Sequence, residues 1–384
     1  MLVVDGLAGF RSGARLSELT LAATPNLDLL AADGAQGLID PIGRGITPGS
    51  GAGHLGLFGY DPLRYRIGRG VFTAAAAGVD VGPGDVVARA NICTLDADGQ
   101  VADRRAGRMS TAAAEEVCAT LCAGLSLGDT QAFLTPETGH RALLRLRGPE
   151  LGPAVSDTDP QRVGVVPLQP TPKDEGAAKT SKVLTELLAQ TRRLLSSRAS
   201  GNYLLLRGFD TAKEVPSFRA RFGMRAVAVV TLPMYRGIAR VLGMEARTVP
   251  SLADGVDALH DVLAGGADFV YLHFADADTA GEDGDTAAKI AAIEEVDRLL
   301  PRIMSAGGDV LVVTGDHATP SQTATHTWHP VPVLLHGGTA PADGLSRFDE
   351  TSCRSGSLGR FSGIELMPQV LAAAGRIAKF DGQS

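Results

Sequence analysis

The chain has 384 residues, of which 44% are hydrophobic, and a formal net charge of −7. This length and apolar content allow a large core and indicate about two domains. The negative charge balance argues against a nucleic-acid footprint, whereas a small anion needs only a local basic pocket. No apolar stretch approaches the ~20 residues of a membrane helix, and the start of the chain, MLVVDG, has no basic leader. We therefore expect a cytoplasmic protein that binds neither nucleic acid nor membranes.

Short apolar runs alternate with helix-like segments along the chain. Residues 2–5 are predicted to form a strand, and residues 17–34 a helix that ends at Gly34. Further strands are predicted at 142–148, 163–168, 203–208, 227–232, 268–274 and 309–315. Amphipathic helices are expected over about 177–197 and about 285–300, where apolar residues recur at helical spacing. Continuous apolar strands separated by helices indicate a mostly parallel sheet that is covered on both faces.

The middle of the chain has a different character. Residues 67–172 contain short strands, Gly/Asp turns and the basic run DRRAGR at 103–108. The segment PLQPTPKDEG, residues 167–176, is typical of a linker. We therefore expect an α/β domain formed by residues 1–66 and 173–384, interrupted by a smaller inserted α+β domain at 67–172.

Acidic residues and histidines follow three of the predicted strands. These residues are Asp5 after the first strand, Asp276, Asp278, Glu282, Asp283 and Asp285 after 268–274, and Asp316 and His317 after 309–315. In parallel sheets, ligands bind beyond the carboxyl ends of the strands. A single such aspartate is most often a cap or turn residue, but here His326 and His329 add imidazoles to three acidic loops. Carboxylates and imidazoles without thiolates suit Mn²⁺ or Zn²⁺, or Mg²⁺ where oxygens dominate, and the ligands suffice for two ions.

The segment TPGSGAGHLG, residues 47–56, places a serine among glycines. It fits the pattern GxGxxG, but a proline precedes the glycines and Val71 lies where a dinucleotide site needs an acid. The glycines let the backbone approach an anion, and a helix that starts near Gly53 would stabilise a phosphoserine at Ser50. Two interpretations stay open: Ser50 is a nucleophile activated by a metal, or it is a plain helix N-cap.

Together, these motifs resemble the archaeal-type cofactor-independent phosphoglycerate mutases of the alkaline phosphatase superfamily. The resemblance covers nearly the whole chain and includes VVDG, ATPNLDLLAADG, PGSGAGHLGLFGYDP, GDVVARANICTLDADGQVADRRAGR, SDTDP, LLLRGFD, DADTAGEDGD, TGDHATP, HTWHPVPVLLHG and GRFSGIELMP. It implies an alkaline-phosphatase-like, mostly parallel sheet sandwiched by helices. It also implies two divalent metal ions, with Mn²⁺ as the expected ion and Mg²⁺ or Zn²⁺ as the alternatives. It implies no requirement for 2,3-bisphosphoglycerate as a cofactor.

The resemblance implies roles for individual residues. Ser50 is the nucleophile that becomes a phosphoserine. One metal ion is held by Asp5, Ser50, Asp316 and His317, and the other by Asp278, Glu282 and His326. The inserted domain binds the glycerate part of a small phosphorylated carboxylate, and the candidate clamps are Arg105, Arg108 and Arg207. A guanidinium fork matches phosphate and carboxylate in two-point contacts, although an exposed, solvated basic run is the alternative for each arginine.

The sequence departs from the family pattern at three positions. Glu282 stands where the family usually has a metal-binding histidine, Gly51 where an acid commonly follows the nucleophile, and Thr73 where glutamate is usual. The leading hypothesis is a metal-dependent phosphoglycerate mutase that works through a phosphoserine. The departures keep a second hypothesis open, a phosphoryl or phosphonyl transferase or a phosphohydrolase with a non-glycolytic substrate. A third is a non-enzymatic paralogue that binds phosphate ligands.

Overall fold

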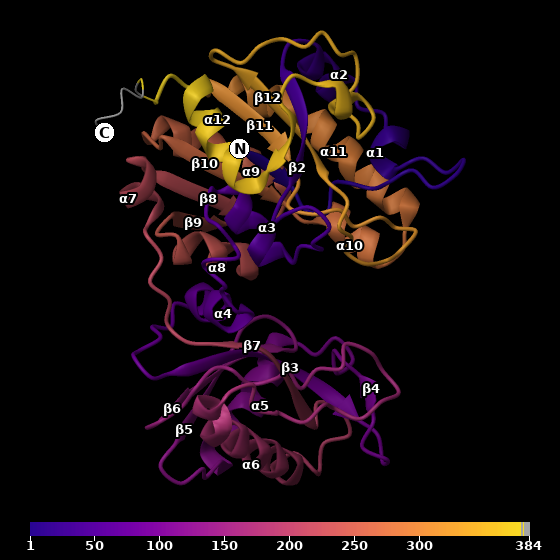
Figure 1. The fold of residues 1–384 in the computed structure, drawn as a ribbon. Coiled ribbons are helices and arrows are strands. Elements are labelled where there is room, and N and C mark those ends of the chain that lie inside the picture. Colours follow the sequence, from indigo (N-terminus) through magenta and orange to yellow (C-terminus); the bar gives the residue numbers. More distant parts are fainter. Residues whose placement is uncertain (378, 380–384) are drawn as a thin grey trace. The chain divides into compact units, whose positions relative to one another are not determined.

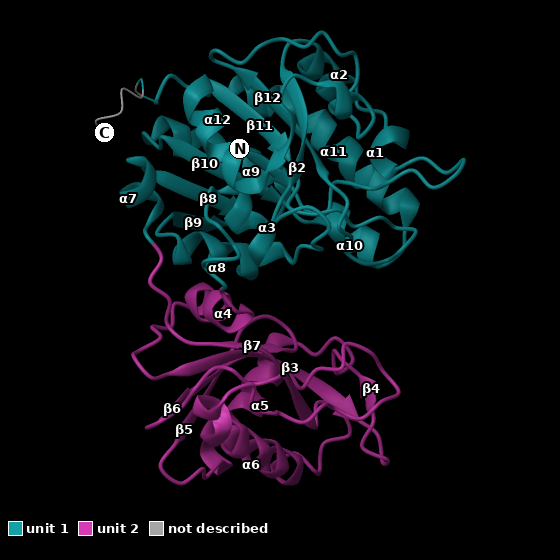
Figure 2. Cartoon of the chain, in the orientation of Figure 1, with its two compact units in different colours: residues 1–66, 216–384 teal, residues 67–215 magenta. Residues whose placement is uncertain are grey.

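The computed structural model describes residues 1–377 and 379. The chain divides into two compact units, which Figure 2 colours separately. Unit 1 comprises Met1–Arg66 and Pro216–Ser384, and unit 2 comprises Ile67–Val215. None of the helices in the described part of the chain combines the length and the apolar character that a bilayer span requires.

Unit 1 is built around an eight-stranded sheet (Figure 1). The strand order is β13 (Gly359–Ser362), β2 (Ala35–Asp40), β12 (Val331–Gly337), β11 (Val310–Thr314), β1 (Leu2–Val4), β10 (Phe269–Phe274), β8 (Ala226–Val230) and β9 (Glu245–Thr248). All neighbouring pairs are parallel except the two that involve β12. Every residue of β1, β8 and β10 is buried, as expected for strands covered on both faces. The predicted α/β class with a mostly parallel sheet is confirmed.

Helices cover this sheet and account for the other apolar runs of unit 1. They are α1 (Glu18–Leu21), α2 (Pro25–Ala32), α3 (Ser50–Leu57), α7 (Phe218–Phe222), α8 (Pro233–Val241), α9 (Leu252–Ala264), α10 (Asp276–Glu282), α11 (Thr286–Ser305) and α12 (Leu366–Ala373). The apolar sides of α1, α2, α9 and α11 share one core with β1, β8 and β10. The single helix predicted over 17–34 is in fact two, because Pro25 disfavours a helical conformation in the residue before it and starts a new helix.

Unit 2 contains a five-stranded antiparallel sheet. Its strands are β4 (Val101–Asp103), β3 (Val86–Leu95), β6 (Arg141–Arg147) and β5 (Gln131–Pro136) in that order, and β7 (Tyr203–Asp210) also pairs with β3. The helices are α4 (Arg69–Ala77), α5 (Thr111–Gly124) and α6 (Ala178–Leu194). Figure 1 shows α5 and α6 on one side of this sheet and α4 on the other. The apolar core of the unit lies on the α5 and α6 side.

The predicted boundary at residues 172 and 173 is corrected by the structure. The expected linker at 167–176 is anchored inside unit 2, where the Leu168 N–H donates to the Thr158 carbonyl (2.9 Å) and the Lys173 N–H donates to the Ala154 carbonyl (2.7 Å). Because α6 and β7 then complete the core of unit 2, the chain returns to unit 1 only at residue 216.

The strand predicted at 163–168 does not form. Val163 and Val166 are exposed, and the backbone of Gly164 has a φ of +72°, outside the range of a strand. Pro167 lacks the N–H that a ladder needs. The apolar composition of this segment was therefore misleading.

Candidate metal centre

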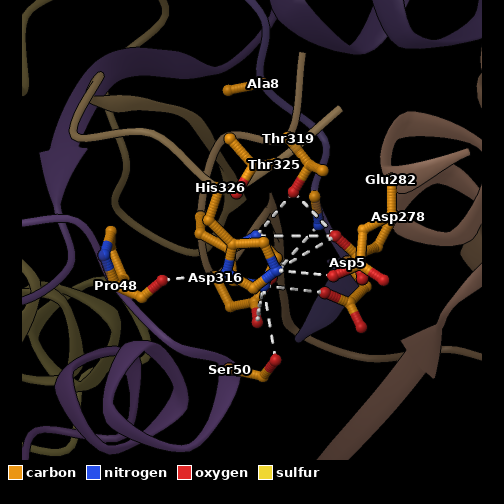
Figure 3. A network of polar contacts seen from close by, with 12 residues as sticks. Asp5, Ala8, Pro48, Ser50, Asp278, Glu282, Asp316, Thr319, Thr325 and His326 are labelled. Carbon is orange, nitrogen blue, oxygen red and sulfur yellow. Dashed lines mark hydrogen bonds and ion pairs between the residues drawn. The ribbon is translucent and has the colours of Figure 1, made fainter. Parts of the chain in front are cut away.

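Three neighbouring strands of unit 1 bring carboxylates to one edge of the sheet. The strands β11, β1 and β10 are adjacent and parallel, so their carboxyl ends meet at this edge. Asp5 follows β1 directly, Asp278 lies in α10 just after β10, and Asp316 follows β11 by two residues. Figure 3 shows these three carboxylates close together. The grouping predicted from the strand ends is thus formed.

Ser50 faces this edge from the first turn of α3. Gly49 caps the helix and Ser50 is its first residue, so the interpretation of Ser50 as a plain N-cap is wrong, and the helix begins earlier than the expected Gly53. The Ser50 Oγ lies 3.4 Å from Nε2 of His317. A Cβ at Gly53 would lie 2.4 Å from the Asp316 carbonyl oxygen, so a glycine is needed for this approach.

The His317 side chain presents a nitrogen lone pair to the site. The Thr319 hydroxyl donates its proton to Asp278 Oδ1 (2.7 Å), so it accepts a hydrogen bond from Nδ1–H of His317 (2.9 Å). Nε2 of His317 lies 3.2 Å from Asp5 Oδ1 and 3.1 Å from Asp316 Oδ2. Neither oxygen has a hydrogen-bond donor among the described residues. Two buried carboxylate oxygens without a hydrogen-bond partner, beside an imidazole nitrogen, fit a bound cation.

His326 offers a second nitrogen beside His317. Its Nδ1–H donates to the Pro48 carbonyl (2.9 Å), which turns Nε2 toward the carboxylates (Figure 3). Nε2 lies 3.6 Å from Asp278 Oδ1 and 3.5 Å from Glu282 Oε1. The Glu282 side chain is 53% exposed, so it reaches the site from the solvent side. The His326 ring stacks on the ring of His317, with centroids 3.7 Å apart.

The candidate ligands form two groups that share His317. In one group the ligand atoms belong to Asp5, Asp316 and His317, and in the other to Asp278, His317 and His326; within each group they lie within 4.8 Å of one another. The structure thus brings together all seven residues named for the metal site: Asp5, Ser50, Asp278, Glu282, Asp316, His317 and His326. The mixed oxygen and nitrogen donors fit Mn²⁺, Mg²⁺ or Zn²⁺. Their role as ligands stays a prediction.

Burial and mutual repulsion shift the pKa values of these groups. Desolvation, with the charge of Asp5, raises the pKa of Asp278 to about 7 and that of Asp316 well above its usual value. Burial also opposes the ionisation of Asp5, but the neighbouring imidazole groups of His273 and His317 hold its pKa well below the usual range. Without a cation, protons on Asp278 and Asp316 therefore reduce the negative charge of the site. A bound cation would balance that negative charge instead.

Two residues behind Asp5 were missed by the sequence analysis. Tyr235, in the first turn of α8, donates its hydroxyl proton to Asp5 Oδ2, and His273 Nε2 lies 3.3 Å from the same oxygen. Both side chains are buried and their rings stack at 3.6 Å. They hold the carboxylate so that Oδ1 faces His317. The histidine inside the otherwise apolar run FVYLHF was a usable signal, whereas nothing near Tyr235 marked it.

The loop that carries Thr319 is held by a buried lysine. Lys289, from α11, is 0% exposed and donates to the carbonyl oxygens of Thr319 (2.7 Å) and Ala8 (3.1 Å). Its Nζ also lies 3.8 Å from a carboxylate oxygen of Glu18. Lys289 therefore fixes the segment that orients His317. The sequence showed it only as one polar residue in an amphipathic helix.

The other histidine of this loop, His329, is not among the grouped ligands. Its ring stacks between Phe10 and Trp328, with centroid distances of 4.2 and 4.6 Å. Its Nδ1 is hydrogen-bonded to the Thr327 hydroxyl (2.9 Å). These contacts agree with the interpretation of His329 as a loop residue.

The arginines predicted to bind substrate all belong to unit 2. Arg105 and Arg108 are exposed in the turn after β4, whereas Arg207 lies in β7 and is partly buried. Burial and the nearby charge of Arg69 lower the pKa of Arg207 to about 10. The neighbouring Arg104 is engaged in an ion pair with an aspartate. Within unit 2, Arg207 therefore differs from Arg105 and Arg108 in being partly buried rather than exposed.

We expect cation binding to strengthen as the pH rises. Below about pH 7, Asp278 holds a proton that a cation must displace, so the affinity of the site for the cation falls below that pH.

The same group affects the stability of the metal-free protein. Because the pKa of Asp278 is raised in the folded state, this carboxyl group stabilises the fold only while it is protonated, and its contribution is lost as the pH rises from about 4 through about 7. Melting temperatures of chelator-treated protein, with and without Mn²⁺, should show the larger Mn²⁺ effect at about pH 8 than at about pH 5.5. Equal effects would contradict the assignment.

Tyr235→Phe should weaken cation binding while keeping the buried ring. The change removes the hydrogen bond that orients Asp5, and loss of such a supporting contact lowers metal affinity by about 10-fold or more. Tyr271→Phe is the matched control, because Tyr271 is also fully buried and its hydroxyl has no hydrogen-bond partner in the described chain. Metal titration by calorimetry checks this, and equal affinities of the two variants would rule out the role of Tyr235.

Comparison with known proteins identifies the family. The family model for 2,3-bisphosphoglycerate-independent phosphoglycerate mutase matches residues 31–199. Two relatives are named probable 2,3-bisphosphoglycerate-independent phosphoglycerate mutase. The protein from Thermus thermophilus is 41% identical to this chain, and the match covers 99% of this chain and 95% of the relative. The protein from Aquifex aeolicus is 38% identical, and the match covers 99% of this chain and 96% of the relative.

Solved structures agree with this assignment. The cofactor-independent phosphoglycerate mutase from Thermoplasma acidophilum has a TM-score of 0.65 and 32% identity, over 97% of this chain and 99% of that one. A protein from Pyrococcus horikoshii has a TM-score of 0.82 and 26% identity, over 99% and 98%. The chain belongs to the 2,3-bisphosphoglycerate-independent phosphoglycerate mutase family.

Proposed function

We propose that the protein interconverts 3-phosphoglycerate and 2-phosphoglycerate and that Ser50 carries the phosphoryl group during the reaction. The observation that carries the proposal is the grouping of His317 Nε2 with the unpartnered oxygens Asp5 Oδ1 and Asp316 Oδ2, with Ser50 Oγ beside it. The names of the relatives support the choice of substrate.

Ser50 occupies a position that suits a phosphorylated nucleophile. Because Nδ1 of His317 holds that ring's proton, the Ser50 hydroxyl donates toward Nε2 at 3.4 Å. Ser50 is the first residue of α3, where free backbone N–H groups and the helix dipole stabilise a phosphate. It is also only 5% exposed, which limits the access of water to a phosphoserine.

The chain's own residues would hold two divalent cations at this edge. We assign one to Asp5, Ser50, Asp316 and His317, and the other to Asp278, Glu282 and His326. When bound, such cations supply positive charge that favours the ionised serine and stabilises the transferring phosphoryl group. Mn²⁺ is the ion we propose, since it accepts both carboxylate and imidazole ligands. Mg²⁺ prefers the carboxylates of this set and Zn²⁺ the imidazoles.

The reaction needs no second phosphorylated compound. Ser50 Oγ loses its proton and forms a bond to phosphorus as the bond from phosphorus to the 3-oxygen of the substrate breaks, and that 3-oxygen takes up a proton. Glycerate then presents its 2-hydroxyl, which loses its proton and takes the phosphoryl group back as the bond from Ser50 Oγ to phosphorus breaks. The Ser50 oxygen regains a proton. Because the phosphoryl group stays on the serine between these steps, no 2,3-bisphosphoglycerate is required. We assign the binding of the glycerate part to unit 2, with Arg105, Arg108 and Arg207 as candidates.

A second function is favoured by Glu282. Its carboxylate adds a negative charge beside His326, where burial opposes protonation but the Glu282 contact raises the pKa of His326 to about 9. This charge would weaken the attraction of the site for a dianionic phosphate. The alternative is transfer of a phosphoryl or phosphonyl group, or hydrolysis of a phosphate ester, on a non-glycolytic substrate.

Ser50→Ala should abolish mutase activity without unfolding the protein. The variant loses the group that bonds to phosphorus, and we expect kcat to fall by at least about 10³-fold. An enolase-coupled assay with 3-phosphoglycerate and Mn²⁺ measures this, and the exposed Ser197→Ala serves as the matched control. Activity retained by Ser50→Ala would refute the proposed mechanism.

Glu282→Gln should raise the Mn²⁺ concentration that the enzyme needs. The substitution keeps the side-chain shape but removes a charged ligand, and we expect the concentration for half-maximal activity to rise about 10-fold. Asp283→Asn is the matched control, since Asp283 is exposed and adjacent to Glu282. An unchanged Mn²⁺ dependence would remove Glu282 from the site.

The same assay separates the two functions. A folded, metal-loaded wild type that is inactive with 3-phosphoglycerate would contradict the mutase proposal. A screen of phosphate monoesters, phosphonates and nucleotide-activated donors would then test the alternative.

A further inference from the structure

The helix that carries Ser50 is a weak helix by its own sequence. In α3, SGAGHLGL, three of the eight residues are glycines. Glycine is the poorest helix former after proline, so the helix depends on contacts with the rest of unit 1. Gly53 and Gly56 permit such contacts, because a Cβ at either position would collide with the backbone carbonyl of Asp316 or of Pro41. The place of Ser50 is therefore set by the groups that hold α3 against its neighbours.

His54 is a fully buried side chain one helical turn after Ser50. Its Nδ1 lies 2.8 Å from the Ser50 carbonyl oxygen. Because that oxygen can only accept a hydrogen bond, Nδ1 carries a proton and donates it, whatever the charge of the ring. The same nitrogen lies 3.2 Å from Asp316 Oδ2, on the segment after β11. The Nδ1–H group of His54 thus lies between the backbone of the proposed nucleophile and a carboxylate that we assign to a cation.

Packing alone does not explain a histidine at this position. Four aromatic rings surround the ring of His54 at centroid distances of 5.2 to 5.9 Å, those of Phe58, Tyr235, Tyr271 and His273. Burial lowers the pKa of His54 to about 4, so the ring is neutral and Nε2 is unprotonated. Nε2 has no hydrogen-bond partner among the described residues. Because a buried polar atom without a partner is unfavourable, an apolar ring would suit these surroundings better, and it is the Nδ1–H group that accounts for the histidine.

We propose that His54 is a positioning residue for phosphoryl transfer, whose Nδ1–H group holds the first turn of α3, and with it Ser50, in place beside Asp316. This role rests on the proposed function, because it concerns the serine that takes the phosphoryl group. The Ser50 hydroxyl contacts His317 rather than His54, so His54 acts through the Ser50 backbone. A small displacement of a reacting group lowers the rate of the chemical step strongly. Loss of the Nδ1–H group should therefore lower kcat and leave KM nearly unchanged.

Three variants of the full chain separate the hydrogen-bond donor from the ring. His54→Phe keeps an aromatic ring among the four neighbouring rings and removes the donor. His54→Asn loses the ring, but its amide nitrogen lies at the same distance along the side chain as Nδ1 and can donate to the Ser50 carbonyl. His54→Gln is the matched control for His54→Asn, since it also loses the ring and places its amide one bond farther out.

Activity and stability should change in opposite directions. In the enolase-coupled assay with Mn²⁺, His54→Phe and His54→Gln should lower kcat about 10- to 100-fold, whereas His54→Asn should stay within about 3-fold of wild type. The melting temperature should be unchanged or higher in His54→Phe, which removes an unpaired nitrogen, and lower in the two variants that leave a cavity. For a histidine that only fills the core, activity would follow the melting temperature, and His54→Phe would be the most active variant.

Calorimetric titration with Mn²⁺ gives a measurement that needs no turnover. Because we assign Ser50 and Asp316 to the same cation, His54→Phe should bind Mn²⁺ about 10-fold more weakly than wild type, and His54→Asn should bind it more tightly than His54→Gln.

The outcomes distinguish a failure of this role from a failure of the proposed function. In an active protein, a wild-type kcat in His54→Phe, or equal losses in His54→Asn and His54→Gln, would overturn the role of His54. If the variants that lose the ring do not fold, His54→Phe decides alone. A wild type that binds Mn²⁺ but does not convert 3-phosphoglycerate would refute the proposed function. In that case the Mn²⁺ affinities decide, and an affinity of His54→Phe equal to that of wild type would overturn the role of His54 as well.

Discussion

Three carboxylates lie within reach of one imidazole in the interior of unit 1, and they cannot all be charged unless a cation lies among them. Much of the local structure follows from this constraint. Tyr235 donates a hydrogen bond to the rear oxygen of Asp5, which His273 also contacts. Thr319 orients both Asp278 and His317, and Gly53 lets α3 come close enough to place Ser50 at the edge. Asp5 Oδ1 and Asp316 Oδ2 have no hydrogen-bond partner among the described residues, and we expect positive charge to bind at these atoms and at His317 Nε2 beside them.

Unit 2 has the opposite imbalance. Its sheet places the buried Arg89 opposite the partly buried Arg207, and neither Nε atom has a hydrogen-bond partner among the described residues. Another arginine of the same unit, Arg147, forms an ion pair with Asp85 at 2.7 Å, and its side chain is half exposed. Each imbalance costs stability in the ligand-free chain, which is common at functional sites.

The sequence predicted the site better than it predicted the limits of the domains. Parallel strands bring their carboxyl ends together, so Asp5, Asp278 and Asp316 could be grouped from the strands that precede them. The buried supports could not be found in this way, because Tyr235 and Lys289 lie on helices with ordinary amphipathic patterns and act through tertiary contacts. The boundary at residue 172 was misplaced because the composition of 167–176 resembles a linker, whereas backbone hydrogen bonds hold it inside unit 2. The unpaired state of Arg89 likewise depends on strand register, which composition does not reveal.

The most direct test of the account is anomalous diffraction from crystals of the protein grown with Mn²⁺. The account predicts two manganese peaks per chain, one contacted by Asp5, Asp316 and His317 and the other by Asp278 and His326, with Ser50 Oγ at the first. No manganese peak among these side chains, in crystals that contain the ion, would contradict the claim that the buried negative charge of unit 1 exists to hold cations beside the serine.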